Sequence, residues 1–377
     1  TRRRFGLSLI AAAAAAASAA VPAWARQGSD PLASQAAGHV YTSTNSPTGN
    51  ELLVYTPQAD GSLALTQRVS TQGLGTGAGL GSQGAVTLST DRRHLFVVNA
   101  ASNTVATLSL KGGQAVLKTV VASGGMMPTS VAEHDGLVYV MNASGDGNVA
   151  GFRNHQGELR PLADGLRGLS AAGGTGPGQV GFDPSGDVLV VTERTSNRLS
   201  SWQVRHNGSL GNIVVTPSSG TTPFGFAFDL RDHLVVSEAF AGAAGASAAS
   251  SYRLAPHPAA TPTLLSASVP TTQTSACWLV IAPNGRHAYT ANAGSSTISS
   301  FRVKRSGRLE LAQAVAGNNG VDAGATDLAM TDDGRRLYAL ASRSLQIVAY
   351  RPDGDGGLEM LGAATGLPLG SVGIAAD

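Results

Sequence analysis

The stretch LVIAPNGRHAYTAN, from Leu279 to Asn292, decides the fold of this 377-residue chain. It reads as two apolar strands joined by a Pro-Asn-Gly turn at 283–285. Pro presets one backbone angle, and Asn and Gly tolerate the positive φ that closes a hairpin. Similar strand-turn-strand segments recur at 86–96, 180–190 and 328–338. Repetition at a period of about 40 to 50 residues is typical of a β-propeller or a solenoid.

Seven positions mark the innermost strand of each repeat. They are spaced by 44 to 53 residues and are Leu88, Glu133, Phe182, Phe228, Ile281, Met330 and Ile374. Residues 372–374 supply the first strand of a repeat, but no second strand follows them in the sequence. Residues 40–55 supply the second and third strands of a repeat, but no first strand precedes them. The sequence therefore predicts an all-β, seven-bladed β-propeller of four-stranded blades. Its ring is closed by pairing N-terminal and C-terminal strands in one blade, which removes the exposed sheet edges that an open array would leave.

The first 25 residues predict export. They contain three arginines, an Ala-rich apolar stretch and a small-residue site at 23–25, the pattern of a cleavable signal peptide. The start Thr-Arg-Arg-Arg-Phe resembles a twin-arginine signal, with an ordinary Arg-rich export signal as the alternative. We expect a signal peptide at 1–25, a linker at 26–37 and a single propeller domain at 38–377, located in a bacterial periplasm or secreted.

Composition narrows the partners. Without residues 1–25 the chain has 23 Lys and Arg against 24 Asp and Glu, and this balance argues against nucleic acid as a partner. No further apolar stretch reaches 18 residues, so no membrane span is expected in the mature chain. The single cysteine, Cys277, excludes an internal disulfide and is expected to be buried. We expect a monomer. The glycine-rich segment 73–81 is predicted to link two blades, since no helix follows it to bind phosphate.

The last residues of the second strands form a polar column that is predicted to surround one channel mouth. The column consists of Thr44, Asn99, Asn142, Glu193, Glu238, Asn292 and Ala341. Two carboxylates in successive blades would share a proton or hold a cation if they lay together. The alternative is that the asparagines cap strand turns and the glutamates are solvated residues of the mouth.

Two sets of residues resemble a known family. Residues 96–99 (Phe-Val-Val-Asn) and 289–292 (Tyr-Thr-Ala-Asn) resemble the propeller repeat named for a Tyr-Val-Thr-Asn signature. The recurrent Gly-x-Leu outer hairpins resemble the lactonase-type seven-bladed propellers, which include 6-phosphogluconolactonase and carboxymuconate lactonizing enzyme. The likeness covers roughly residues 38–377, and it implies the same fold and an activity on lactones.

The resemblance also implies where the chemistry lies. The family uses a His, an Arg, a Glu and a second Arg on one mouth of the channel. The family's Pro-His-Ser motif aligns with residues 128–130, so Thr129 stands in place of the His. The family's Gly-Pro-Arg-His motif aligns with residues 176–179, so Gly178 and Gln179 stand in place of the Arg and the His. The Glu position falls on Glu193 or on Arg194, depending on a gap of one residue that reverses the side chain. No arginine stands at the second Arg position, near Glu238.

Two functions follow as expectations. The first is a noncatalytic scaffold that binds a small molecule, glycan or protein at a channel mouth formed by Asn99, Thr129, Asn142, Gln179, Asn292 and Arg343. The alternative is a lactone hydrolase or lactonizing enzyme with Glu193 or Glu238 as acid or base and Arg194 holding an anion. A Ca²⁺ ion on Glu193, Glu238, Asn99 and Asn142 would resemble the site of calcium-dependent gluconolactonase-type propellers. No other cofactor is predicted.

Overall fold

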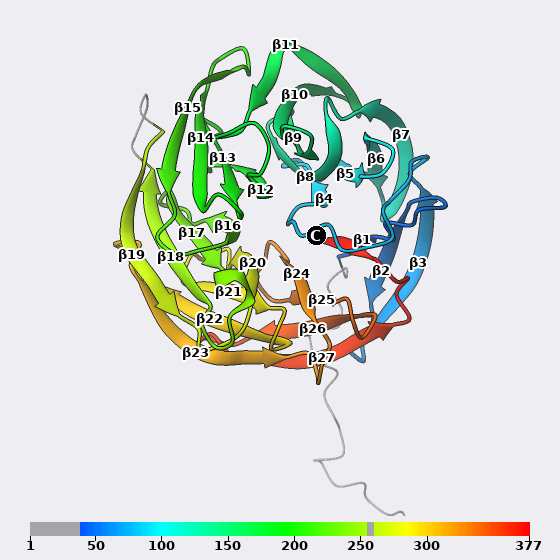
Figure 1. Cartoon of the computed structure of the whole chain (residues 1–377). Coiled ribbons are helices and arrows are strands. Elements are labelled where there is room, and N and C mark those ends of the chain that lie inside the picture. The colour runs from blue at the N-terminus through cyan, green and yellow to red at the C-terminus, as the bar shows by residue number, and fades with distance from the viewer. Residues whose placement is uncertain (1–37, 255–259) are drawn as a thin grey trace, which may run out of the picture. The chain divides into compact units, whose positions relative to one another are not determined.

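The computed structural model describes residues 38–254 and 260–377, which form a closed ring of seven four-stranded sheets (Figure 1). Every neighbouring pair of strands within a sheet is antiparallel. The predicted seven-bladed β-propeller is confirmed. The predicted signal peptide and linker lie outside the described residues. No described helix is long and apolar enough to cross a membrane.

The blades follow one another along the chain, each running from an innermost strand to an outermost one. The first three consist of β28 (Val372–Ala376), β1 (Val40–Ser43), β2 (Glu51–Pro57) and β3 (Leu63–Ser70); β4 (Val86–Leu88), β5 (His94–Asn99), β6 (Thr104–Lys111) and β7 (Gln114–Ala122); and β8 (Met126–His134), β9 (Leu137–Ser144), β10 (Asn148–His155) and β11 (Glu158–Gly168). The glycine-rich segment 73–81 connects the first two blades, as predicted.

The other four blades repeat this plan. They consist of β12 (Pro177–Phe182), β13 (Val188–Glu193), β14 (Arg198–Val204) and β15 (Leu210–Pro217); β16 (Pro223–Phe228), β17 (His233–Glu238), β18 (Ala248–Leu254) and β19 (Pro262–Pro270); β20 (Ala276–Ile281), β21 (His287–Asn292), β22 (Thr297–Val303) and β23 (Leu309–Asn318); and β24 (Ala325–Met330), β25 (Leu337–Ala341), β26 (Gln346–Pro352) and β27 (Leu358–Thr365). A short 3₁₀-helix, η3 (Phe240–Gly242), follows β17.

The C-terminal strand closes the ring. Strand β28 pairs with β1, with Val40 opposite Ala376, and becomes the innermost strand of the blade that the N-terminal strands build. The Tyr41 hydroxyl donates a hydrogen bond of 3.0 Å to the Asp377 carboxylate beside this seam. The predicted pairing of the two ends is confirmed. Closure completes the fourth strand of this blade, so the ring has no partial blade with exposed strands.

The core lies between the blades. In one cluster Tyr139 of β9 packs with Leu189 of β13 and Trp202 of β14, so side chains of two adjacent sheets share one apolar layer. All three side chains are at most 1% exposed. Because each sheet is covered on both faces by its neighbours, the inner strands are buried along almost their whole length.

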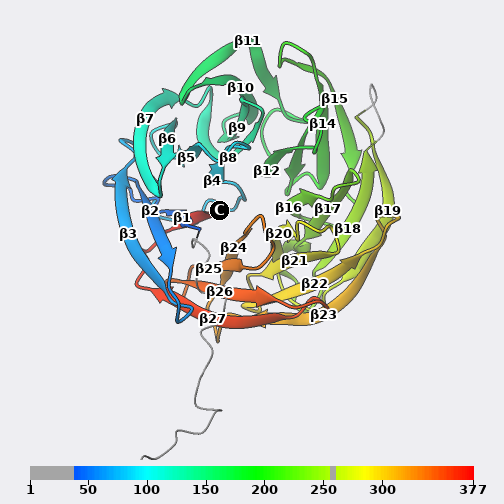
Figure 2. The same cartoon turned by 180° about the vertical axis from the view of Figure 1, so that it is seen from behind.

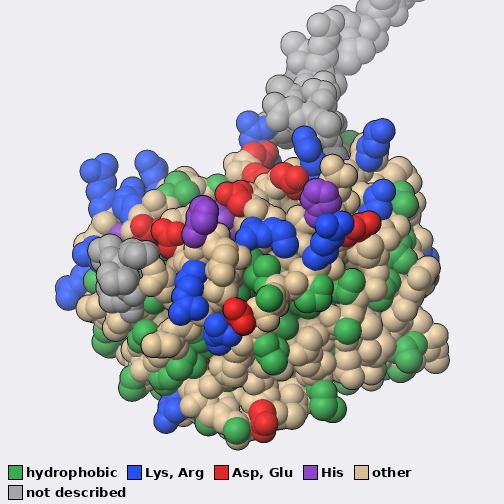
Figure 3. All heavy atoms as spheres, turned by 90° about the horizontal axis from the view of Figure 1, so that it is seen from above, with side chains coloured by type: hydrophobic (Ala, Val, Ile, Leu, Met, Phe, Trp, Pro, Cys, Tyr) green, Lys and Arg blue, Asp and Glu red, His purple; other side chains and the backbone are tan. Residues whose placement is uncertain are grey.

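The ring has two unlike faces, seen from opposite sides in Figure 1 and Figure 2. We call the face with the β-hairpin turns after each first and third strand the hairpin face. The linker face carries the turns after each second strand and the connections between blades. Among the described residues, these linker-face connections contain as charged residues only Asp146, Arg194, Asp322 and Arg343. Figure 3 shows the ring edge-on, with charged side chains gathered toward one side.

Candidate functional site

Residues 80–84, which we call the plug segment, close the central channel on the linker face. They lie in the connection between β3 and β4 and bond to three other blades. The Ser82 hydroxyl donates to the Thr129 carbonyl at 2.7 Å, and the Gln83 N–H donates to the Gly178 carbonyl at 3.0 Å. These two acceptors belong to the third and fourth blades, so the plug segment is fixed to the channel wall.

The plug segment also crosses the channel to the sixth blade. The side-chain amide of Gln83 donates to the Leu279 carbonyl at 2.8 Å and accepts from the Leu279 N–H at 3.0 Å. The indole N–H of Trp278 donates to the Ser82 carbonyl at 2.8 Å. The side chain of Gln83 thus satisfies the N–H and the carbonyl of Leu279 on the inner edge of β20, as a residue of a neighbouring strand would. These bonds join residues 196 positions apart in the chain.

Glycine allows the plug segment to turn into the channel. Gly81 and Gly84 have φ of 61° and 86°, in the region that favours glycine. A Cβ on Gly84 would lie 2.9 Å from the Ser130 hydroxyl, so there is no room for a side chain at this position. The segment can therefore bend twice within five residues and present Gln83 to the opposite wall.

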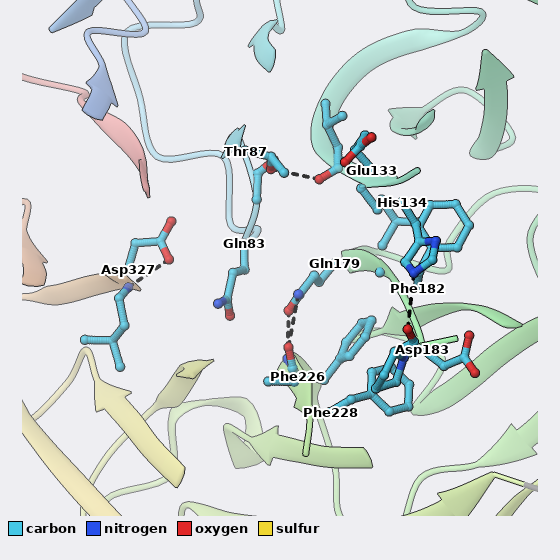
Figure 4. Close-up of a pocket in the computed structure, with 18 of the residues that line it drawn as sticks. Gln83, Thr87, Glu133, His134, Gln179, Phe182, Asp183, Phe226, Phe228 and Asp327 are labelled. Carbon is cyan, nitrogen blue, oxygen red and sulfur yellow. Dashed lines mark hydrogen bonds between the residues drawn. The ribbon is translucent and has the colours of Figure 1, made fainter. Parts of the chain in front are cut away.

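Below the plug segment, a cavity of about 430 Å³ extends toward the hairpin face (Figure 4). Gln83 and Gly84 contribute to its lining. The remaining wall comes from innermost strands and the hairpin turns that follow them. The polar and aromatic residues that line it are Thr87, Glu133, His134, Gln179, Phe182, Asp183, Phe226, Phe228 and Asp327. The channel is therefore a blind pocket, sealed by the plug segment at one end.

Asp327 is a buried carboxyl group in the wall of this cavity. It lies where the pairing of β24 with β25 shifts register between Ala325 and Leu328, and such a bulge redirects a side chain. Its side chain is 2% exposed and accepts a 2.8 Å hydrogen bond from the N–H of Leu328. Burial raises the pKa of Asp327 well above its ordinary range, although the backbone N–H groups of Leu328 and Ile374 act in the opposite direction.

Three phenylalanines supply the aromatic part of the cavity wall, which also contains aliphatic residues such as Val131, Val180 and Leu328. Phe226 and Phe228 of β16 stand edge to face, with ring centroids 6.0 Å apart, and Phe182 ends the neighbouring strand β12. Gln179 holds these two strands together, because its side chain donates to the Phe226 carbonyl at 3.1 Å and accepts from the Phe226 N–H at 2.7 Å. In Figure 4 the labelled phenylalanines lie on one side of the pocket and Asp327 lies on the other.

The other two carboxylates of the cavity have internal partners. Glu133 accepts from the backbone N–H of Thr90 at 2.6 Å, from the Thr90 hydroxyl at 2.8 Å and from the Gly136 N–H at 2.7 Å. Asp183 accepts from the Val188 N–H at 2.8 Å and the Ser185 hydroxyl at 2.6 Å. Glu133 therefore ties two blades together, and Asp183 shapes a hairpin turn.

The structure places Glu193 differently from the sequence prediction. This carboxylate is fully buried rather than solvated at a mouth. It accepts hydrogen bonds from the Ser170 N–H at 3.0 Å, the Ser200 hydroxyl at 2.6 Å and the Ser196 hydroxyl at 2.7 Å, and also from the Ser170 hydroxyl. Glu193 therefore joins its own second strand to the next strand and to the preceding connection.

Glu238 is also fully buried and has its own set of donors. It accepts from the Gly220 N–H at 2.8 Å and from the hydroxyls of Ser250 at 2.5 Å and Ser268 at 2.7 Å. Burial raises the pKa of Glu238, and these three donors partly oppose that effect. The two glutamates share no hydrogen-bond donor. The predicted pair of carboxylates at one open mouth is not formed, because each side chain turns into its own blade.

The asparagines of the column are likewise bonded within the sheets. Asn142 donates to the Ser123 carbonyl at 3.1 Å, and Asn292 donates to the Ser299 hydroxyl at 2.9 Å. Asn99 accepts from the Thr71 hydroxyl at 2.6 Å. All three side chains are fully buried. They do not line a mouth, contrary to that prediction, and they brace strand ends as the capping alternative describes. The described residues contain no group of three or more His, Cys, Asp and Glu that could hold a metal ion. Of the predicted Ca²⁺ ligands, Glu193 and Glu238 each accept hydrogen bonds from separate protein donors.

The remaining predicted residues have mixed positions. Gln179 lines the cavity, whereas Thr129 is buried beneath the plug segment. Arg194 lies beside the plug segment, where its Nε donates to the Gly176 carbonyl at 3.1 Å and its guanidinium stands 5.1 Å above the Phe224 ring. Burial lowers the pKa of Arg194. Arg343 is exposed and donates to the carbonyls of neighbouring linker-face connections, so it lies outside the cavity.

Sequence reasoning missed Gln83 and Asp327. Asp327 is an acidic residue inside the mostly apolar strand ATDLAM of β24, and such an interruption is a readable signal for a polar group in a buried strand. No comparable signal marks Gln83, because its partners are distant in sequence. Cys277 is buried as predicted, and burial raises the pKa of its thiol to about 12.

Comparison with known proteins supports the family resemblance. Residues 251–372 match the family described as Lactonase, 7-bladed beta-propeller. No curated protein matches the chain.

Solved structures with the same fold include two of related name. One is a candidate 6-phosphogluconolactonase from Bacteroides fragilis (15% identity, 92% of this chain and 100% of that one, TM-score 0.68). Another is the periplasmic gluconolactonase PpgL of Pseudomonas aeruginosa (18% identity, 89% and 98%, TM-score 0.68). A third is a Lactobacillus plantarum protein (15% identity, 90% and 99%, TM-score 0.71). The resemblance to lactonase-type propellers is confirmed, and at these identities the solved structures establish the fold alone.

Proposed function

We propose that this chain, which resembles the lactonase-type seven-bladed propellers, is a ligand-binding protein that takes a small molecule into the cavity on its hairpin face. The observation that carries the proposal is the plug segment. It occupies the mouth where the resemblance places lactone chemistry, and it bonds directly to Thr129 and Gly178, two of the positions that would carry that chemistry.

The residues around the plug segment also favour binding over catalysis. Opening or closing a carboxylated lactone ring requires an accessible acid or base and a cation to hold the carboxylate. Arg194 is a cation near this mouth, but Glu193 and Glu238 are fully buried and accept hydrogen bonds from serine hydroxyls and backbone N–H groups. A general base needs a free lone pair within reach of its substrate.

The cavity on the other face has the properties of a ligand site. Its volume of about 430 Å³ lies within the range of small-molecule pockets. Its wall combines apolar rings with a few polar groups, which include Gln83, Gln179 and Asp327. A blind pocket also retains a ligand better than an open tube, since the ligand can leave through one mouth only.

A lactone hydrolase or lactonizing enzyme is the second candidate function. The names of the Bacteroides fragilis and Pseudomonas aeruginosa proteins favour it. In that case Glu193 or Glu238 would serve as acid or base and Arg194 would hold the anion, after movement of the plug segment. This candidate requires the plug segment to leave the channel and the two carboxylates to exchange their serine partners for substrate.

Export is part of the proposal. The arginines and apolar stretch of residues 1–25 support a periplasmic or secreted protein, and a structural neighbour is periplasmic. Fractionation of bacterial cells tests this. We expect wild-type protein in the periplasm or medium, and retention in the cytoplasm when Arg2 and Arg3 are both replaced by lysine. Export of the double variant at the wild-type level would contradict the twin-arginine route.

Two measurements test the choice between binding and catalysis. We expect no hydrolysis by the wild type above the uncatalysed rate on a panel of neutral, phosphorylated and carboxylated lactones. Turnover that is abolished in the Glu193→Gln, Glu238→Gln double variant would overturn the proposal. Turnover by the wild type alone would also overturn it, even if the double variant does not fold.

The binding arm uses a small-molecule library with ligand-observed NMR. Thr87→Trp places a large side chain in the cavity, and Thr48→Trp, at an exposed turn of the linker face, is the matched control. We expect hits that bind the wild type and Thr48→Trp but not Thr87→Trp. Hits that bind all three proteins equally would show that ligands do not enter this cavity.

A further inference from the structure

We propose that the ligand of this cavity is a small organic cation that carries an amine, with Asp327 as its counter-ion and the phenylalanine wall as its apolar support. The inference rests on the proposed function, since it names the chemical class that the same cavity takes. It also sets this chain apart from a protein that recognises phosphorylated or carboxylated lactones.

The charges of the lining favour a cation. Asp327, Glu133 and Asp183 contribute carboxyl groups, whereas among the described residues no Lys or Arg lines the cavity and His134 is the one basic side chain that does. An adjoining hollow of about 510 Å³ contains Arg92, but that guanidinium pairs with Asp332. A phosphate or carboxylate would therefore meet like charges without a cation to hold it.

Asp327 is the carboxyl with capacity for a ligand. Glu133 and Asp183 each accept hydrogen bonds from both side-chain and backbone donors of the protein. Asp327 receives only backbone N–H groups, and no described Lys, Arg or His forms an ion pair with it. A carboxylate that is 98% buried without a cation is unfavourable, and an ammonium group from a ligand would supply the missing partner.

The opposite wall suits the rest of such a ligand. Phe182, Phe226 and Phe228 line the cavity across from Asp327 (Figure 4). Aromatic rings attract a cation near their faces and pack against apolar groups, so they favour an amine on a hydrocarbon or aromatic body. A polyol would gain little from this wall, because it would lose hydration without equivalent hydrogen bonds.

Three probes of nearly equal size and different charge test the inference. Benzylamine is cationic, benzyl alcohol is neutral and benzoate is anionic at neutral pH. Calorimetric titration into the full chain measures each affinity at pH 7.5. We expect benzylamine to bind at least tenfold more tightly than benzyl alcohol, and benzoate to bind more weakly than the alcohol.

The variant Asp327→Asn should lower the benzylamine affinity at least tenfold and leave the benzyl alcohol affinity unchanged. Asp322→Asn removes an acidic residue from the linker face and is the matched control, for which we expect wild-type affinities. Far-UV circular dichroism of each variant verifies that it is folded.

Three results would overturn the inference. They are equal affinities for benzylamine and benzyl alcohol, an Asp327→Asn variant that retains the preference for the amine, and no binding of benzylamine at all. If benzyl alcohol or library hits bind the wild type but not Thr87→Trp, the cavity is a ligand site and only the charge preference fails. If no molecule distinguishes Thr87→Trp from wild type, the proposed function fails with it.

Discussion

The two mouths of the channel differ in how their polar groups are paired. At the linker face, Gln83 and Trp278 join opposite sides of the ring, and every polar group of the plug segment named above has a protein partner. Toward the hairpin face, the channel is hollow and contains Asp327, a buried carboxyl without a side-chain partner. We expect the hydrogen bonds of the first region to stabilise the ring and the unpaired carboxyl of the second to reduce its stability.

Buried carboxylates show the same contrast. Glu238 has three donors, including two serine hydroxyls, and Asp327 has only backbone N–H groups. A buried carboxylate that accepts several hydrogen bonds from the protein stabilises the fold. A buried carboxylate in a cavity that lacks side-chain donors is a candidate for binding a ligand. Substitutions of Trp278, Glu238, Gln83 and Asp327 test this division.

Trp278→Ala should be the most destabilising of these changes. The indole is 8% exposed, packs against Phe224 at a centroid distance of 4.9 Å and donates to the Ser82 carbonyl. Loss of this side chain should lower the free energy of unfolding by about 3 to 5 kcal/mol. Urea denaturation followed by far-UV circular dichroism measures the change. Trp278→Phe keeps a ring against Phe224 and should cost less than half as much, and equal losses would contradict the packing role.

Glu238→Gln should destabilise the fifth blade. The amide would retain one acceptor oxygen, and its NH₂ group would face hydroxyl and N–H donors. We expect a loss of about 2 to 3 kcal/mol, since buried donors are left without an acceptor. The same urea measurement applies. The matched control is Glu359→Gln, which removes an exposed ion pair with Arg351 and should cost no more than about 1 kcal/mol. A near-neutral Glu238→Gln would show that its carboxylate is free for chemistry.

Gln83→Ala should weaken the plug segment without unfolding the ring. It removes both hydrogen bonds to the backbone of Leu279, and the freed groups can still bond to water in the channel. We therefore expect a loss of about 1 to 2 kcal/mol. Gln58→Ala, at an exposed hairpin turn, should be close to neutral. Hydrogen exchange at the Leu279 N–H should accelerate in Gln83→Ala, and unchanged protection there would contradict the bond across the channel.

Asp327→Asn should have the smallest effect, of the opposite sign. Burial raises the pKa of Asp327 above its unfolded value, so the folded state binds the proton more tightly and stability falls as the pH rises through that interval. The other titratable groups lining the same cavity are Glu133, His134 and Asp183. We expect the variant to melt a few degrees higher than wild type at pH 8, with the difference shrinking toward pH 4. A lower melting temperature at pH 8 would mean that the Asp327 carboxylate has a stabilising partner.

The repeat positions could be predicted from the sequence, but the directions of their side chains could not. The column from Asn99 to Asn292 does lie at the ends of second strands. In a sheet with one solvated face, the alternation of apolar and polar residues along a strand would distinguish buried side chains from exposed ones. Here both faces of each blade are covered by neighbours, so alternation does not separate a channel residue from one that braces a strand. For this reason the sequence pattern predicts Glu193 and Glu238 at a channel mouth, whereas both are buried in the structure.

The candidate site escaped prediction for two physical reasons. The side chain of Asp327 is set by a bulge in β24, and a bulge shifts the alternation by one residue without a strong sequence signal. The side chain of Gln83 bonds to a strand 196 residues away, and the ring must close before these two meet. Local pattern contains no information about such a contact.

The blade count, the four-stranded plan and the closure of the ring follow from the sequence, because hairpin turns and apolar strands are local features that repeat. The sealed mouth, the hydrogen bonds of the glutamates within the blades and the position of Asp327 beside a cavity follow only from the assembled ring. Those outcomes depend on which strands meet across the channel, and that geometry arises from the packing of all seven blades at once.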